Sequence, residues 1–167
     1  KYLNNNRREH MAECRYCKKS FIRDSTLSSH MCVKKRRYTD KDSVGSRLGL
    51  NVFCRFYELT TMNKKPKTFD DFVNSSYYAD FVKFGRHLVA LNPININAFI
   101  DFVINNSIKL RDWTKDYVYE TYLHDLTKKE QADKALERTI VEMQSWAKIN
   151  NEEYYNFFRN VLIKKFY

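Results

Sequence analysis

The chain has 167 residues, 43% of them hydrophobic and 16% aromatic, and carries a formal net charge of +10. No apolar run approaches the roughly 18 residues of a membrane span and no signal peptide is evident, so we expect a cytoplasmic protein, in the host cytoplasm if it is viral, with no membrane partner. Three glycines and two prolines are too few for the tight turns of an all-β fold, which makes all-α the predicted class.

The positive charge is concentrated at the N-terminal end. Residues 1–37 contain eleven Lys and Arg residues against three acidic ones, an excess of eight, whereas the rest of the chain has an excess of two. Such an asymmetry indicates a polyanionic partner that meets one end of the molecule.

The basic segment also holds a cluster of cysteines and a histidine, within the stretch CRYCKKSFIRDSTLSSHMC. Cys14 and Cys17 have the C-x2-C spacing at which a tight turn brings two thiolates onto one metal ion, and His30 and Cys32 follow. Three cysteines beside a histidine in so short a stretch suit a metal site in a reducing compartment better than a disulfide framework.

Phe21 and Leu27 fall between these residues, giving the pattern C-x2-C-x3-F-x5-L-x2-H. It resembles the zinc finger with two cysteine and two histidine ligands, in a variant whose last ligand is a cysteine. The family places its fourth ligand three to five residues after the histidine, whereas Cys32 follows His30 after a single residue. Because residues i and i+2 point to different sides of a helix, both can bind one metal only if the helix ends near His30. We therefore expect a short helix over about residues 24–30.

The predicted cofactor is Zn²⁺, bound by Cys14, Cys17, His30 and Cys32. A segment of this length is too short to be held by burial alone, so zinc would supply its folding free energy. His10 is a competing fourth ligand, although it lies outside the matched spacing.

The resemblance implies base contacts from the start of the finger helix, at Arg23, Thr26 and Ser29. Arg23 suits a guanine edge. Phosphate contacts are expected from the basic residues on and beside the finger, which are Arg7, Arg8, Arg15, Lys18, Lys19, Lys34, Lys35, Arg36 and Arg37. A single finger buries little surface, so we expect modest, salt-dependent and weakly specific binding, to DNA rather than RNA.

The chain is predicted to consist of a basic zinc-finger segment (1–37), a polar linker (38–43) and a compact bundle of five to seven helices (44–167). Apolar residues recur at helical spacing throughout the last part. The predicted helix N-caps are Ser43, Thr68 in a capping box with Asp71, Asn95 or Asn97, and Thr127 in a capping box with Glu130. The most regular apolar stripe runs from Ala132 to Ala147, and the many tyrosines are expected mainly in the core.

No motif indicates catalysis. The three glycines stand outside any phosphate-binding loop, and His87 and His124 are expected to be surface or boundary residues. Cys54 is expected in the core. We therefore predict that the protein is not an enzyme; a zinc-stabilised nuclease would need clustered carboxylates, which the sequence does not display.

The predicted function is that of a zinc-finger nucleic-acid-binding protein, whose helical domain docks a partner in replication, transcription or recombination. The helical part loosely resembles small all-α replication accessory proteins of phages, such as helicase loaders. The alternative is a structural or assembly protein that uses the finger to dock an acidic protein subunit.

Overall fold

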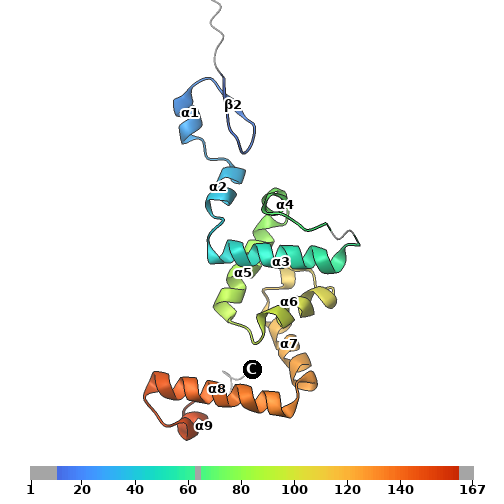
Figure 1. The fold of residues 1–167 in the computed structure, drawn as a ribbon, viewed down its shortest axis with the longest axis vertical. Coiled ribbons are helices and arrows are strands. Elements are labelled where there is room, and N and C mark those ends of the chain that lie inside the picture. Colours follow the sequence, from blue (N-terminus) through green and yellow to red (C-terminus); the bar gives the residue numbers. More distant parts are fainter. Residues whose placement is uncertain (1–10, 63–64, 162–167) are drawn as a thin grey trace, which may run out of the picture. The chain divides into compact units, whose positions relative to one another are not determined.

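A computed structural model describes residues 11–62 and 65–161. It confirms the all-α class: within these residues the regular structure is helical, apart from one two-stranded sheet (Figure 1). Contacts divide the chain into two compact units, Lys1–Arg111 and Asp112–Tyr167, whereas the sequence placed a boundary at residues 38–43. None of the helices in the described ranges combines the length and apolar character needed to cross a membrane.

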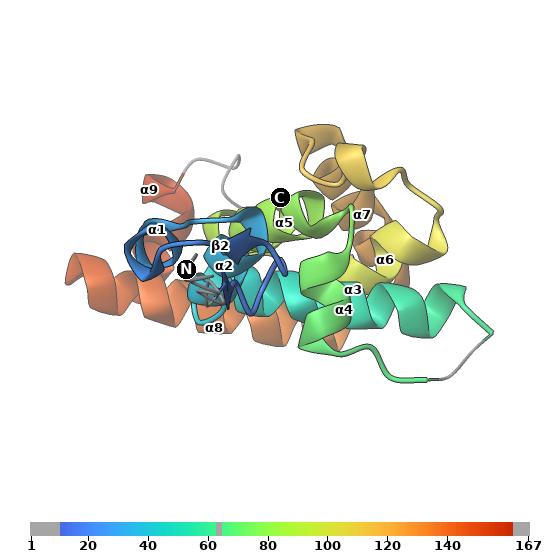
Figure 2. The same cartoon turned by 90° about the horizontal axis from the view of Figure 1, so that it is seen from above.

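The first unit begins with residues 11–32, which we call the finger. Strands β1 (Ala12–Glu13) and β2 (Ser20–Phe21) pair antiparallel, and helix α1 (Asp24–Ser29) lies beside them (Figure 2). The predicted short helix is confirmed to within one residue at its end, because His30 already has extended backbone.

Helix α2 (Val33–Thr39) follows at once, where the sequence showed only basic residues and the start of a linker. Its N-cap is Cys32, whose sulfur accepts the Lys35 backbone N–H at 3.3 Å. Helix α2 contacts helix α4, described below. Its helical conformation therefore depends on a sulfur cap and on tertiary contacts rather than on an apolar stripe.

The most extensive helix pair joins α3 (Val44–Thr60) and α5 (Tyr78–Leu91), which lie side by side in Figures 1 and 2. Their close approach depends on glycine. A Cβ atom at Gly85 would lie 2.4 Å from the carbonyl oxygen of Gly45 and 2.7 Å from the amide nitrogen of Gly49. A Cβ atom at Gly49 would likewise lie 2.9 Å from the Phe81 carbonyl oxygen, so both Gly49 and Gly85 are needed for this contact between backbones.

Phenylalanine rings fill the core around this pair. Phe53 on α3 meets Phe81 on α5 and Phe72 on α4 (Phe69–Asn74), with ring centroids 5.4 and 5.2 Å apart. Phe84 on α5 meets Phe99 on α6 (Ile96–Asn105) at 5.9 Å. Burial of these large rings is the main stabilising contribution to this part of the chain.

The caps of these helices follow the local sequence. Ser43 accepts the Ser46 N–H, which confirms the predicted cap. Of the two candidates Asn95 and Asn97, Asn95 is the N-cap, because it accepts the Ala98 N–H. Thr68 and Asp71 form the predicted capping box. The 3₁₀ turn η1 (Leu110–Asp112) follows α6.

The second unit contains α7 (Asp116–Lys129), α8 (Ala132–Asn150), the 3₁₀ turn η2 (Tyr154–Asn156) and α9 (Phe157–Asn160). The predicted capping box of Thr127 and Glu130 is wrong. Thr127 lies inside α7 and its hydroxyl donates to the His124 carbonyl, whereas the Glu130 carboxylate accepts the Arg138 guanidinium at 2.8 Å. The ion pair outweighs the local capping pattern.

The stripe on α8 and the tyrosines are less buried than the sequence suggested. No residue of α8 is fully buried, and Leu136, a member of the predicted stripe, is 60% exposed. Tyr78 and Tyr122 are core residues as expected. The expectation is wrong for four other tyrosines, which are more than half exposed: Tyr77, Tyr117, Tyr154 and Tyr155.

Candidate metal centre

The β1–β2 hairpin positions the first two ligands. The Lys18 N–H donates to the Cys14 carbonyl at 2.8 Å, and the Cys14 N–H donates to the Lys19 carbonyl at 2.9 Å. Lys18 has a positive φ of 62°, which lets the chain reverse directly after Cys17. The tight turn brings both thiols to the same side of the hairpin, as the C-x2-C spacing predicted.

His30 and Cys32 supply the other two ligands from extended backbone between helices. His30 is the C-cap of α1, with φ −66° and ψ 123°, and Cys32 is the N-cap of α2, with φ −84° and ψ 165°. In a continuous helix their side chains would diverge. The break between the two helices is what brings the i and i+2 side chains together.

The four side chains converge. Their ligand atoms all lie within 4.8 Å of one another, and His30 Nε2 is 3.3 Å from Cys17 Sγ. Two ligands on a tetrahedral zinc ion are about 3.5 to 3.8 Å apart, so the cluster is close to the spacing that zinc requires. Cys14 is buried and the other three are half-buried. This group of three cysteines and one histidine could hold a metal ion.

Backbone amides favour the thiolate of Cys14, whereas the pKa of Cys17 shifts the other way. The pKa of the Cys14 thiol is lowered to about 7, chiefly by the Cys17 backbone N–H, although burial opposes the shift. The Lys19 backbone N–H also lowers the pKa of Cys17, but burial and the neighbouring thiols outweigh it, and that pKa is raised. Hydrogen bonds from N–H groups to a sulfur stabilise the thiolate, which is the form that binds a metal.

The finger has little hydrophobic core of its own. Phe21 packs against the His30 ring with centroids 4.7 Å apart, and both Phe21 and Leu27 are half-buried. Among residues 11–32, Cys14 is the one buried hydrophobic side chain. The two predicted core positions therefore support the ligands rather than hold the finger by themselves.

Most of the predicted nucleic-acid-binding residues within the described ranges have exposed side chains: Arg15, Lys18, Lys19, Arg23, Thr26, Ser29, Lys34 and Arg36. Lys18 lies 3.5 Å from Glu13, and the Ser29 hydroxyl donates within its own helix, to the Ser25 carbonyl at 3.1 Å. Arg7 and Arg8, with the alternative ligand His10, lie outside the described residues.

Two of the predicted basic residues are engaged inside the protein. Arg37 donates to the backbone carbonyls of Val73 and Ser75, and its guanidinium lies 4.4 Å from the centre of the Tyr78 ring. Lys35 Nζ donates to the His30 carbonyl at 3.0 Å. Arg37 thus anchors α2 to the helices of the first unit, and Lys35 anchors it to the finger, which leaves Lys34 and Arg36 as the outward cations of α2.

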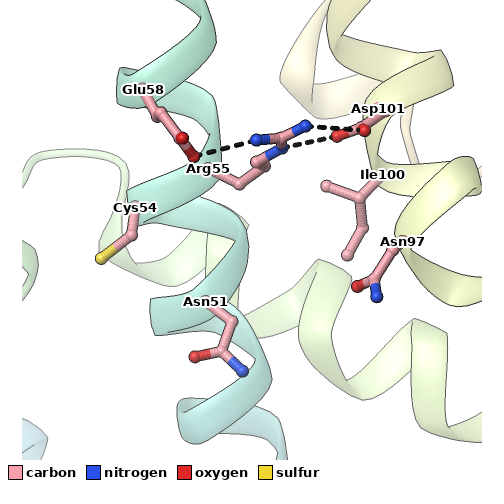
Figure 3. A pocket seen from close by; sticks show the side chains of 7 residues that line it. All are labelled: Asn51, Cys54, Arg55, Glu58, Asn97, Ile100 and Asp101. Carbon is pink, nitrogen blue, oxygen red and sulfur yellow. Dashed lines mark hydrogen bonds and ion pairs between the residues drawn. The ribbon is translucent and has the colours of Figure 1, made fainter.

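A second polar site, which the sequence did not predict, lies between α3 and α6 (Figure 3). Arg55 donates to both Asp101 oxygens at 2.7 and 2.8 Å and to Glu58 at 3.0 Å. Cys54 points away from this ion pair and its thiol lies 3.6 Å from the Lys67 carbonyl, half-buried rather than in the core. Because protein carboxylates engage the guanidinium, the arrangement joins two helices rather than offering a cation to a ligand.

In residues 11–62 and 65–161, no other group of three or more Cys, His, Asp or Glu side chains is arranged to hold a metal. Comparisons with models of known families, with curated proteins and with solved structures find no match. The chemistry of the cysteine and histidine cluster and its basic surroundings is therefore the basis for a functional assignment.

Proposed function

We propose that the chain is a non-enzymatic, zinc-dependent nucleic-acid-binding protein, with DNA as its partner and an accessory role in replication, transcription or recombination. The observation that carries this proposal is the convergence of Cys14, Cys17, His30 and Cys32 within a basic region whose cations face solvent. Three thiolates and an imidazole form a donor set suited to a structural Zn²⁺ site. The helical part would dock a protein partner.

Charge and exposure support a contact with the phosphate backbone. Six outward cations lie on the finger and α2, namely Arg15, Lys18, Lys19, Arg23, Lys34 and Arg36. Helix α1 has six residues and, apart from Asp24, no charged side chain, so base reading would be limited to Arg23, Thr26 and Ser29. We therefore expect affinity to depend mainly on phosphate contacts and little on sequence.

The test is a titration of the zinc-loaded full chain against duplex DNA, single-stranded DNA and RNA. If five of the outward cations contact phosphates, affinity for DNA should fall about 500-fold between about 50 and about 200 mM salt. The double substitution Lys34→Gln with Arg36→Gln should weaken binding, whereas Lys128→Gln with Lys148→Gln in the second unit is a matched control with the same loss of charge. Equal affinity of both variants and the parent would contradict the proposal.

One observation favours the alternative of a protein-docking finger. Four large apolar side chains on or beside the finger are more than half exposed: Met11, Ile22, Met31 and Val33. Substitution of Ile22 and Met31 by Ser leaves the charge unchanged, so nucleic-acid affinity should stay within about twofold of the parent. If the finger instead docks a protein, the chain should show no salt-dependent affinity for any of the three nucleic acids.

A further inference from the structure

A basic residue of α5 lies at the end of α2, although the two helices are far apart in the sequence. Asp40 is the C-cap of α2, and its carboxylate is 3.7 Å from the guanidinium of Arg86. The Arg86 side chain is 66% exposed. Arg86, which no sequence pattern groups with the finger, thus lies on the exposed surface at the end of α2.

Gly45 explains how Arg86 reaches this place. A Cβ atom at Gly45 would lie 2.5 Å from Arg86 Cγ and 3.2 Å from Nε. The aliphatic part of Arg86 therefore crosses the bare backbone at the start of α3, and its guanidinium projects beyond α3 to Asp40.

Two further cations flank this point. Arg36 lies four residues before Asp40, so the two side chains share one face of α2, and Arg36 is exposed. Lys83 lies one helical turn before Arg86 on α5 and is exposed too. Asp80, on the preceding turn of α5, and Asp42, just after α2, are the exposed acids near this group in the sequence. Asp40 pairs with the Arg86 guanidinium and lies one helical turn after Arg36.

The Asp40 carboxylate is also engaged elsewhere. It accepts the buried Ser46 hydroxyl at 2.8 Å, which fixes its orientation. An exposed ion pair at 3.7 Å contributes little free energy, so Asp40 holds Arg86 only weakly. The planar guanidinium keeps donors for a phosphate, which it can bind through two parallel hydrogen bonds.

We propose that Arg36, Lys83 and Arg86 form a second phosphate-binding surface, the α2–α5 surface, which contacts the backbone of the same duplex DNA that the finger engages. This inference rests on the proposed nucleic-acid-binding function and extends the interface from the finger and α2 to α5. It assigns Asp40 as the group that phosphate displaces from Arg86.

The first test removes two of these charges. The zinc-loaded full chain carrying Lys83→Gln and Arg86→Gln should bind a duplex of about 20 base pairs about tenfold more weakly than the parent, with the slope of log affinity against log salt reduced by about 1.8. The control variant Lys128→Gln with Lys148→Gln loses the same charge from the second unit and should keep the parental slope. Thermal unfolding of both variants checks that the fold is retained.

The second test replaces Asp40 and should change DNA affinity in the opposite direction from the first test. Asp40→Asn keeps an oxygen that accepts the Ser46 hydroxyl but removes the charge that competes with phosphate, so DNA affinity should rise about two- to fivefold. If Asp40 and Arg86 mattered only for the fold, loss of their ion pair would weaken binding in both variants. Opposite effects of the two variants are therefore specific to a phosphate contact.

The outcomes separate this inference from the function on which it rests. Parental affinity and salt slope in the Lys83→Gln, Arg86→Gln variant, together with weakened binding by Lys34→Gln with Arg36→Gln, would overturn the phosphate contact of α5 and leave the contacts proposed for the finger and α2 intact. Binding of single-stranded DNA or RNA in preference to the duplex would overturn the duplex assignment. No binding to any of the three would overturn both.

Discussion

The finger and the α3–α5 pair belong to the same compact unit but are stabilised in different ways. The finger has one buried hydrophobic side chain, Cys14, whereas α3 and α5 bury phenylalanine rings and bring backbone against backbone at Gly85. The first arrangement brings together four side chains that could hold a metal ion, and the second removes apolar surface from water. If a metal ion binds the finger, it takes the place of a hydrophobic core there. The two regions should then respond separately to metal removal and to substitutions in the helical core.

Metal removal should have the largest effect. Structural zinc contributes about 10 to 16 kcal/mol of apparent binding free energy in finger peptides. Chelation, or Cys17→Ser, should therefore unfold the finger while α3–α6 stay folded, as amide NMR signals assigned to each region would show. Cys54→Ser is the control, because this thiol lies outside the cluster. If the NMR signals of the finger stayed dispersed without metal, the finger would not depend on a metal for its fold.

Gly85→Ala should have the next largest effect, confined to the helices. The added Cβ meets the backbone atoms of Gly45 and Gly49, which cannot move without separating α3 from α5, so we expect a loss of about 3 kcal/mol in urea unfolding. Gly45→Ala is the matched variant. Its Cβ meets Cγ of the Arg86 side chain, which can move by a change of rotamer without separating the helices, and helix propensity favours Ala, so we expect a smaller loss of about 1 to 2 kcal/mol.

Both glycine variants should keep the Co²⁺ absorption spectrum of the finger, since the cluster does not involve α5. Equal stability of the two variants would show that the close approach of α3 and α5 is not a stabilising feature.

The smallest effect should come from the ion pair between α3 and α6. Hydrogen bonds from Arg55 hold the pKa of Asp101 below its ordinary value. A carboxyl whose folded pKa is depressed adds stability above its unfolded pKa of about 4, and this contribution is lost as the pH falls through the folded pKa. Because both side chains are about one-third exposed, the contribution should not exceed about 1 kcal/mol.

Asp101→Asn measures this contribution by urea unfolding. The parent should be more stable than the variant at pH 7, and the difference should shrink toward pH 3. A difference that stays constant with pH would show that Asp101 acts through packing instead.

Local signals in the sequence predicted much of the fold and the grouping of the four Cys and His side chains. Ser43 and Thr68 cap helices as expected because each hydroxyl accepts the backbone N–H three residues further on, and the Asp71 carboxylate accepts the Thr68 backbone N–H in return. The Cys and His spacing correctly grouped four side chains, because a turn and a short helix have fixed dimensions. It also required a helix break near His30, which the structure contains.

The errors arose where contacts distant in sequence decide the structure. Helix α2 has no apolar stripe and is held by Arg37 on the Val73 and Ser75 carbonyls and by Tyr38, whose ring lies 5.4 Å from that of Phe69. Glu130 fits a capping box but pairs with Arg138, two turns further along. Arg86 could not be assigned to the α2–α5 surface, because its position follows from the bare backbone at Gly45.

Helix α2 is held at both of its ends. Cys32 belongs to the metal-ligand cluster and also caps the first turn, while Arg37 and Tyr38 fix the last turn to helices further along the chain. Seven residues alone would not stay helical in water. A partner that contacts Lys34 or Arg36 therefore meets side chains on a backbone that is already ordered, and association need not supply the entropy of folding it.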